Sequence, residues 1–129
     1  MRNFFLLFFG LTSSPAFAEW VEIYADDLGA YSVNIPATET PNHKIKMWGM
    51  SDYKSAQKAG SDDYRSIKSL FEYDCNEAQR RMLSITFYQE SRGRGLVVQT
   101  DAWVAEWEPI IPDSLGGLYL KTACEQKHY

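Results

Sequence analysis

The sequence is poor in the side chains that metal binding and catalysis most often use. It has two histidines, His43 and His128, two cysteines and no C-x-x-C pair. A transition-metal site needs several His, Cys, Asp or Glu ligands brought together, and the sequence shows no such cluster. No serine lies in a G-x-S-x-G motif,. We therefore expect no enzyme activity, no metal ion and no cofactor, and we interpret both histidines as exposed.

An excess of basic residues is also absent. The chain has 13 lysines and arginines against 17 aspartates and glutamates, a formal net charge of −4. Nucleic acids are bound by basic surfaces, so we expect no nucleic-acid partner. Neighbouring carboxylates such as Glu106 and Glu108 are interpreted as a solvated surface rather than as a glycosidase pair.

The first eighteen residues have the layout of a secretory signal peptide. Arg2 gives a positive start, residues 4–11 form an apolar run, and Ala16-Phe17-Ala18 is a small-x-small cleavage site,. The run is too short for a stable membrane span, and no later run approaches that length. The alternative is a buried N-terminal helix or strand. We predict a signal peptide over residues 1–18, one domain over residues 19–129, and export to the periplasm or the cell surface of a Gram-negative bacterium.

Cys75 and Cys124 are the only cysteines of this predicted exported chain. Two cysteines in an oxidising compartment are expected to pair. The bond would close a loop of about 50 residues and stabilise the fold by roughly 4 kcal/mol on the chain-entropy model. The alternatives, a reactive thiol or a metal pair, find no C-x-x-C or histidine cluster to support them.

The stretch from Tyr64 to Tyr88 predicts a hairpin with one apolar face. Its two runs alternate with the period of a half-buried strand, and the polar residues 76–79 between them suit a turn,. The residues on the apolar face are Ile67, Phe71, Tyr73, Cys75, Leu83, Ile85 and Phe87. Such a face needs a covering element, and Cys75 would draw the segment that carries Cys124 onto it.

Other segments complete the predicted fold. We expect strands over 20–25, 30–34, 43–52 and 96–100, a loop over 53–63, and a helix over 113–127,. Trp48 is expected in the core, and Gly49 is expected to mark a bulge or the close approach of another backbone. Residues 101–108 fit either a helical turn or an irregular segment. The fold class is therefore α+β, a six-stranded antiparallel sheet packed against a C-terminal helix, with one disulfide.

Two sets of residues could form a binding surface. Arg92 and Arg94 lie in a glycine-rich turn that could hold an anion with guanidinium and backbone N–H groups, although a tight turn with positive φ at its glycines explains the same residues. Trp103 and Trp107 could form an exposed surface for a sugar or a protein, although core packing is the alternative.

The chain also resembles the bacterial surface-adhesin protein E family. The resemblance rests on short elements in the same order along the chain: Ala18–Glu22, Lys46–Trp48, Tyr64–Ser69, Glu72–Cys75, Trp107–Pro109 and Lys121–Cys124. It implies an antiparallel sheet with a C-terminal helix, a Cys75–Cys124 disulfide and a non-enzymatic role in adhesion to host proteins such as extracellular-matrix components. The chain departs from the family in lacking a lipoprotein cysteine near the cleavage site, and in reading Tyr31-Ser32-Val33-Asn34-Ile35-Pro36 where Tyr-Val-Asp-Pro is usual.

Together these features predict an exported, adhesin-like protein with a protein ligand from the host or the envelope. The alternative is a periplasmic domain that binds a small ligand or a glycan through Trp103, Trp107, Arg92 and Arg94. Unpaired sheet edges could also join two copies into a homodimer.

Overall fold

A computed structural model describes residues 18–126 of the chain. The predicted signal peptide lies outside the described residues except for Ala18, and so does His128. Within residues 18–126 no helix is both long enough and apolar enough to cross a membrane.

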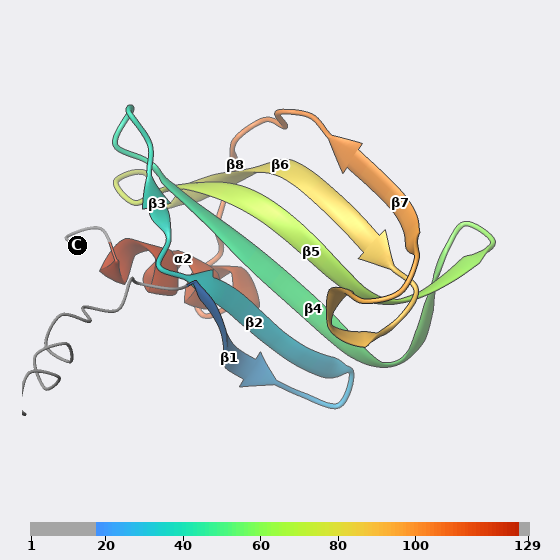
Figure 1. The fold of residues 1–129 in the computed structure, drawn as a ribbon. Coiled ribbons are helices and arrows are strands. Elements are labelled where there is room, and N and C mark those ends of the chain that lie inside the picture. The colour runs from blue at the N-terminus through green and yellow to red at the C-terminus, as the bar shows by residue number, and fades with distance from the viewer. Residues whose placement is uncertain (1–17, 127–129) are drawn as a thin grey trace, which may run out of the picture.

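The fold is an antiparallel sheet with one helix packed against it (Figure 1). The strand order is β1-β2-β4-β5-β6-β7, with β3 paired to β4 and β8 paired to β6. The sheet has eight strands, so the prediction of six was wrong in number. The two additional strands have two residues each and are too short to show a pattern in the sequence. The strands are β1 (Glu19–Ala25), β2 (Gly29–Ile35), β3 (Thr38–Glu39), β4 (Ile45–Ala59), β5 (Asp62–Asp74), β6 (Gln79–Tyr88), β7 (Val97–Ala102) and β8 (Glu108–Pro109).

The predicted central hairpin is present as β5 and β6. Ile67 pairs with Phe87 and Ser69 with Ile85, so the apolar residues of the two strands share one face. The register then shifts, because Leu70 pairs with Ser84 and Phe71 with Met82. Leu83 is the extra residue of this bulge, and Met82 takes the position opposite Phe71 that strict alternation assigns to Leu83.

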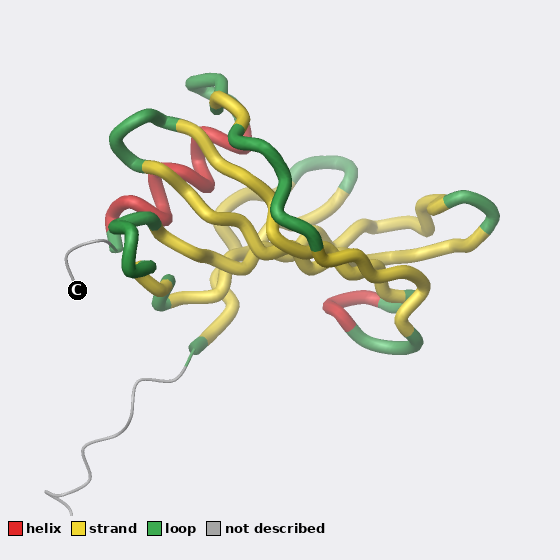
Figure 2. The backbone as a smooth tube through the Cα atoms, turned by 90° about the horizontal axis from the view of Figure 1, so that it is seen from above, coloured by secondary structure: helices red, strands yellow, loops and turns green. Residues whose placement is uncertain are grey.

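The predicted loop over residues 53–63 was wrong. Strand β4 continues to Ala59 and β5 begins at Asp62, with Gly60 at φ 65° in the turn between them. Figure 2 shows this hairpin projecting beyond the rest of the sheet. No layer covers either face of this hairpin, and both faces carry polar residues. The alternation of apolar and polar side chains that reveals a half-buried strand is therefore missing.

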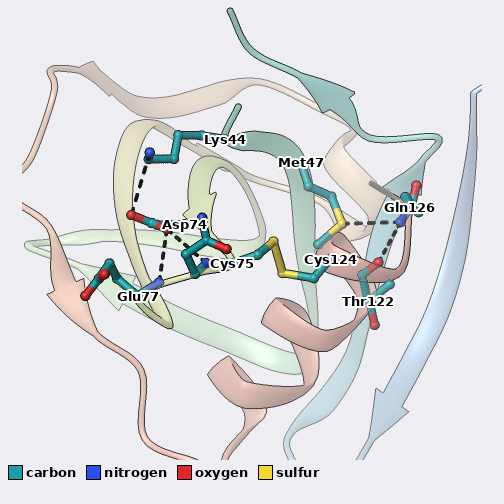
Figure 3. Close-up of a disulfide and its surroundings, with 9 residues drawn as sticks. Lys44, Met47, Asp74, Cys75, Glu77, Thr122, Cys124 and Gln126 are labelled. Atoms are coloured by element: carbon teal, nitrogen blue, oxygen red, sulfur yellow. Dashed lines mark hydrogen bonds and ion pairs between the residues drawn. A yellow bond between two sulfur atoms is a disulfide. The ribbon is translucent and has the colours of Figure 1, made fainter. Parts of the chain in front are cut away.

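Helix α2 (Leu115–Glu125) covers one face of the sheet at one end. It starts two residues later than predicted because the Ser114 hydroxyl accepts the N–H of Gly117 and caps it, while Asp113 has φ 61°,. The predicted disulfide is confirmed: Cys75 and Cys124 are bonded, with Cα atoms 5.8 Å apart. Figure 3 shows it beside Met47, where Gln126 donates hydrogen bonds to Thr122 O and Met47 Sδ.

The core lies between α2 and this face of the sheet. Its buried members come from β2, β4, β5 and α2, and they are Tyr31, Val33, Ile45, Met47, Tyr73, Tyr119 and Ala123. Gly49 was expected to mark a bulge or a close backbone. It is instead paired regularly with Val33 and Ser69, and the ring of Tyr119 lies over it.

The opposite face is partly covered by the loop that holds the short helix η1 (Ser91–Gly93). Ser66, which is fully buried, donates to Glu90 O at 2.6 Å and accepts the N–H of Gly93 at 2.8 Å. Figure 2 shows η1 and α2 on opposite sides of the sheet and at opposite ends of it. Each face is therefore covered over only part of its length.

Candidate binding surface

The sheet face that points away from α2 is uncovered at the end where α2 packs on the other side. Its residues form two rows across three strands. We call this region the open face, and its residues are Lys46, Trp48, Leu70, Glu72, Arg81 and Ser84. Their sequence neighbours Met47 and Phe71 point toward α2, so these side chains point away from it. Within residues 18–126 no helix or strand lies over them.

A stack of three side chains crosses the open face. Arg81 Nε and Nη2 each lie 2.8 Å from Glu72 Oε1, and the Glu72 side chain is only 6% exposed. Arg81 Cζ also lies 4.5 Å from the ring centroid of Trp107. A guanidinium held by a carboxylate and an aromatic ring has already lost most of its rotamer freedom, so little more is lost when a partner binds to it.

Trp48 belongs to the open face and not to the core. It is 40% exposed, whereas its neighbour Met47 is 1% exposed. The prediction that Trp48 is buried was wrong because both faces of β4 are apolar at this point, and only the position of α2 decides which face is covered.

Trp103 lies at the edge of the open face. The segment from Trp103 to Trp107 is irregular and follows β6, with Trp103 N donating to Leu83 O and Ala105 N to Met82 O. Trp103 is 50% exposed and Val104 65%. Trp107 is only half-buried, so both tryptophans of the predicted surface are accessible.

Arg92 and Arg94 lie at the other end of β6. They are exposed, and Arg92 has the φ value of 59° that a tight turn needs. The N–H of Arg92 donates to Asp52 Oδ1, that of Gly93 to Ser66 Oγ and that of Arg94 to Ser91 O. These N–H groups are therefore occupied within the fold and do not form a free anion nest. From Leu83, beside Trp103, to Tyr88 the strand rises roughly 17 Å, so the structure does not bring the two arginines next to the tryptophans.

His43 and Asp74, which lie outside the open face, have structural partners. His43 is exposed, with Nδ1 3.4 Å from Glu39 Oε2, and it has φ 63° in a turn, so the prediction that it starts a strand was wrong. Burial alone would raise the pKa of Asp74. The hydrogen bonds from Glu77 N and Asn76 N and the charge of Lys44 outweigh it and hold that pKa below its usual value (Figure 3). Within residues 18–126 no three His, Cys, Asp or Glu side chains form a group that could hold a metal ion.

An apolar groove of about 550 Å³ runs between β1 and α2. Val21, Ile23 and Ile35 line one side, and Thr122 and Gln126 line the other. Strand β1 is one free edge of the sheet and β7 is the other. Pairing of two copies through such an edge stays a prediction.

The fold and this surface define a class of small disulfide-linked α+β domains that leave part of a sheet face exposed. Comparison with known proteins places the chain within one family. A family model described as surface-adhesin protein E matches residues 20–125, and the chain belongs to that family. The resemblance seen in the sequence is thereby confirmed. Comparison with curated proteins found no match.

Two solved structures have the same fold. Protein E of Haemophilus influenzae, in crystal form II, matches with a TM-score of 0.64 at 12% identity, over 77% of this chain and 83% of that one. Protein E from non-typeable Haemophilus influenzae matches with a TM-score of 0.56 at 12% identity, over 83% of this chain and 82% of that one. At this identity the likeness concerns the fold alone.

Proposed function

We propose that this protein is an exported, non-enzymatic binding protein of the adhesin type, and that it holds a protein ligand on the open face. The observation that carries the proposal is the stack of Trp107, Arg81 and Glu72 beside the exposed Trp48. Tryptophan and arginine are the residues that most often dominate binding energy at protein interfaces.

The spacing of the predicted surface residues favours a protein over a small ligand. One sugar or anion could not touch both Trp103 and Arg94, because they lie at opposite ends of the β6–β7 hairpin. A protein that buries about 800 Å² on each side could span that length. The set Trp103, Trp107, Arg92 and Arg94 therefore enters the proposal as an extension of the open face along β6.

Family membership and the predicted signal peptide support the location and the partner. A surface adhesin acts outside the cytoplasm, in the periplasm or at the cell surface of a Gram-negative bacterium. The partner is then a host protein of the extracellular-matrix type or another protein of the envelope.

The test is a binding titration of residues 19–129 against purified extracellular-matrix proteins, combined with crosslinking in the native envelope. We expect micromolar or tighter binding to one partner. Trp107→Ala and Trp48→Ala should each weaken it by about tenfold or more, as truncation of an interface anchor does. Leu28→Ala is the matched control, because Leu28 is 62% exposed but lies in the β1–β2 turn away from the open face.

Three outcomes would contradict the proposal. The first is the absence of any partner in both experiments. The second is binding that the two tryptophan variants leave unchanged. The third is retention by a glycan array with no protein partner, which would favour the glycan-binding alternative.

A further inference from the structure

A small cavity lies on the other side of the sheet, at the N-terminal end of α2. Its volume is about 190 Å³. Its floor consists of Gly49, Ser51 and Ser69, and Phe71, Arg80 and Tyr119 form most of its wall. It is distinct from the open face because these residues point toward α2.

The three floor residues have short side chains, and two of them are serines whose hydroxyls make the floor polar. Gly49 pairs with Ser69, and Ser51 is the next residue of β4 on the same face. The ring of Tyr119 reaches over Gly49, and a Cβ on this glycine would lie 3.5 Å from Tyr119 Cε1. Within residues 18–126 the hydroxyls of Ser51, Ser69 and Tyr119 make no hydrogen bond. Burial raises the pKa of Tyr119, so its hydroxyl stays protonated and can donate.

Of the described residues that line the cavity, Arg80 is the one with a positive charge. Its Cζ lies 4.1 Å from the centroid of the Phe71 ring, and its Nη1 lies 3.5 Å from the Tyr73 hydroxyl. Within residues 18–126 no carboxylate pairs with Arg80, whereas the next residue, Arg81, is paired with Glu72. In a chain of net negative charge, a guanidinium that is stacked, half-buried and unpaired is available to an anion,.

We propose that this cavity binds one carboxylate group, with Arg80 as the bidentate donor and Ser51, Ser69 and Tyr119 as hydroxyl donors. A guanidinium fork matches the planar carboxylate, and several donors can each reach one of its lone pairs. Phe71 and Leu115 provide an apolar wall for the carbon atoms next to the carboxylate. The cavity is smaller than a drug-sized site and holds about six water volumes, which suits a short organic acid or the end of a peptide chain.

The experiment follows amide and arginine side-chain NMR signals of residues 19–129 during titration with butyrate. Butyramide, inorganic phosphate, and one short peptide with a free or an amidated C-terminus are titrated in parallel. We expect saturable shifts at Ser51, Ser69 and the Arg80 Nε–H with butyrate, and none with butyramide. Tighter binding of the free-acid peptide than of butyrate would assign the carboxylate to a peptide end, and the reverse would assign it to a free organic acid.

Variants test the role of Arg80. Arg80→Met keeps apolar contact with Phe71 but removes the charge, and Arg80→Lys keeps the charge but removes the fork. Both should weaken butyrate binding by about tenfold or more, while Lys58→Met, on the exposed β4–β5 hairpin, should not change it. Near-ultraviolet circular dichroism checks that each variant is folded, and if Arg80→Met is not, Arg80→Lys and Ser69→Ala decide the outcome.

Absence of saturable shifts with butyrate and with the free-acid peptide would overturn the proposal. Equal binding of butyramide, tighter binding of phosphate, or full binding by the Arg80 variants would do so as well. None of these results depends on the open face, so the two proposals fail separately.

Discussion

The ring of Tyr119 lies directly over Gly49, at a distance that leaves room for a methyl group and little more. A Cβ at position 49 would be 3.5 Å from Tyr119 Cε1 and 3.8 Å from Cζ. Tyr119 is one of the two buried residues of α2. The size of the residue at position 49 therefore limits how closely α2 can pack on the sheet.

The first prediction follows from this contact. Gly49→Ala should change the free energy of unfolding by less than about 1 kcal/mol, because a methyl group meets Tyr119 at ordinary van der Waals distance. Gly49→Ile should lower it by about 1–3 kcal/mol, because the larger side chain must displace the ring. Urea unfolding of the two variants measures the difference, and equal midpoints would contradict the close approach of Tyr119.

The second prediction concerns the disulfide. Replacing Cys75 and Cys124 together by alanine should lower the free energy of unfolding by roughly 4 kcal/mol on the chain-entropy model. This is a large share of the typical 5–15 kcal/mol of a domain. Denaturant unfolding of the double variant measures it, and the reduced wild-type protein is the control that should behave alike. An unchanged midpoint would mean that the bond does not constrain the unfolded chain.

The third prediction concerns Ser66, whose hydroxyl holds the η1 loop over the sheet. Ser66 is fully buried, and Ser66→Ala leaves the carbonyl of Glu90 and the N–H of Gly93 without this partner, which should cost about 1–3 kcal/mol,. Faster hydrogen exchange at Gly93 should accompany the loss. Ser61→Ala, in the exposed β4–β5 turn, is the matched control. If both variants were equally stable, the Ser66 bridge would be unimportant.

The fourth prediction concerns acid stability. The pKa of Asp74 is lowered in the folded protein, so the unfolded state takes up the proton first as the pH falls. The stabilisation by Asp74 is complete above the unfolded pKa of about 3.9 and is lost as the pH falls through the lower folded value. Asp74→Asn keeps an acceptor for Asn76 N and Glu77 N but cannot titrate. It should therefore lose less stability than the wild type between pH 5 and pH 2.5.

Urea midpoints at several pH values in that range measure the effect. Glu77→Gln is the control, because it removes an exposed carboxylate next to the same turn. A pH dependence in Asp74→Asn as steep as in the wild type would show that other carboxylates control acid unfolding.

The central hairpin and the disulfide could be predicted because each rests on a local signal. Alternation along 64–88 marks a half-buried strand pair, and two cysteines in an exported chain leave one pairing. The hairpin beyond residue 53 could not be predicted, because neither of its faces is covered and its residues therefore show no alternation of apolar and polar side chains. The bulge at Leu83 was also hidden, since a register shift changes the pairing without changing the composition.

The candidate binding surface shows the same division. Residue type alone identified Trp103, Trp107, Arg92 and Arg94. That the two tryptophans lie a β6 length away from the two arginines depends on strand pairing. Trp48 and Arg81 were missed. For Trp48 no sequence signal distinguishes the covered face of β4 from the open one. Arg81 is in phase with Leu83, Ile85 and Phe87, so strict alternation assigns it to the covered face, and only the bulge at Leu83 turns it to the open one,.

The amino-acid sequence by itself determined the strand pairs with an apolar face, the terminal helix, the covalent link between them and the family. These depend on residue type and on spacing along the chain. The tertiary structure alone decided which face of the sheet α2 covers, and with it that Trp48 is exposed, that Arg81 is paired and that Arg80 lines a cavity. The physical reason is that both faces of β4 are apolar enough to be buried, and a single short helix can cover only one.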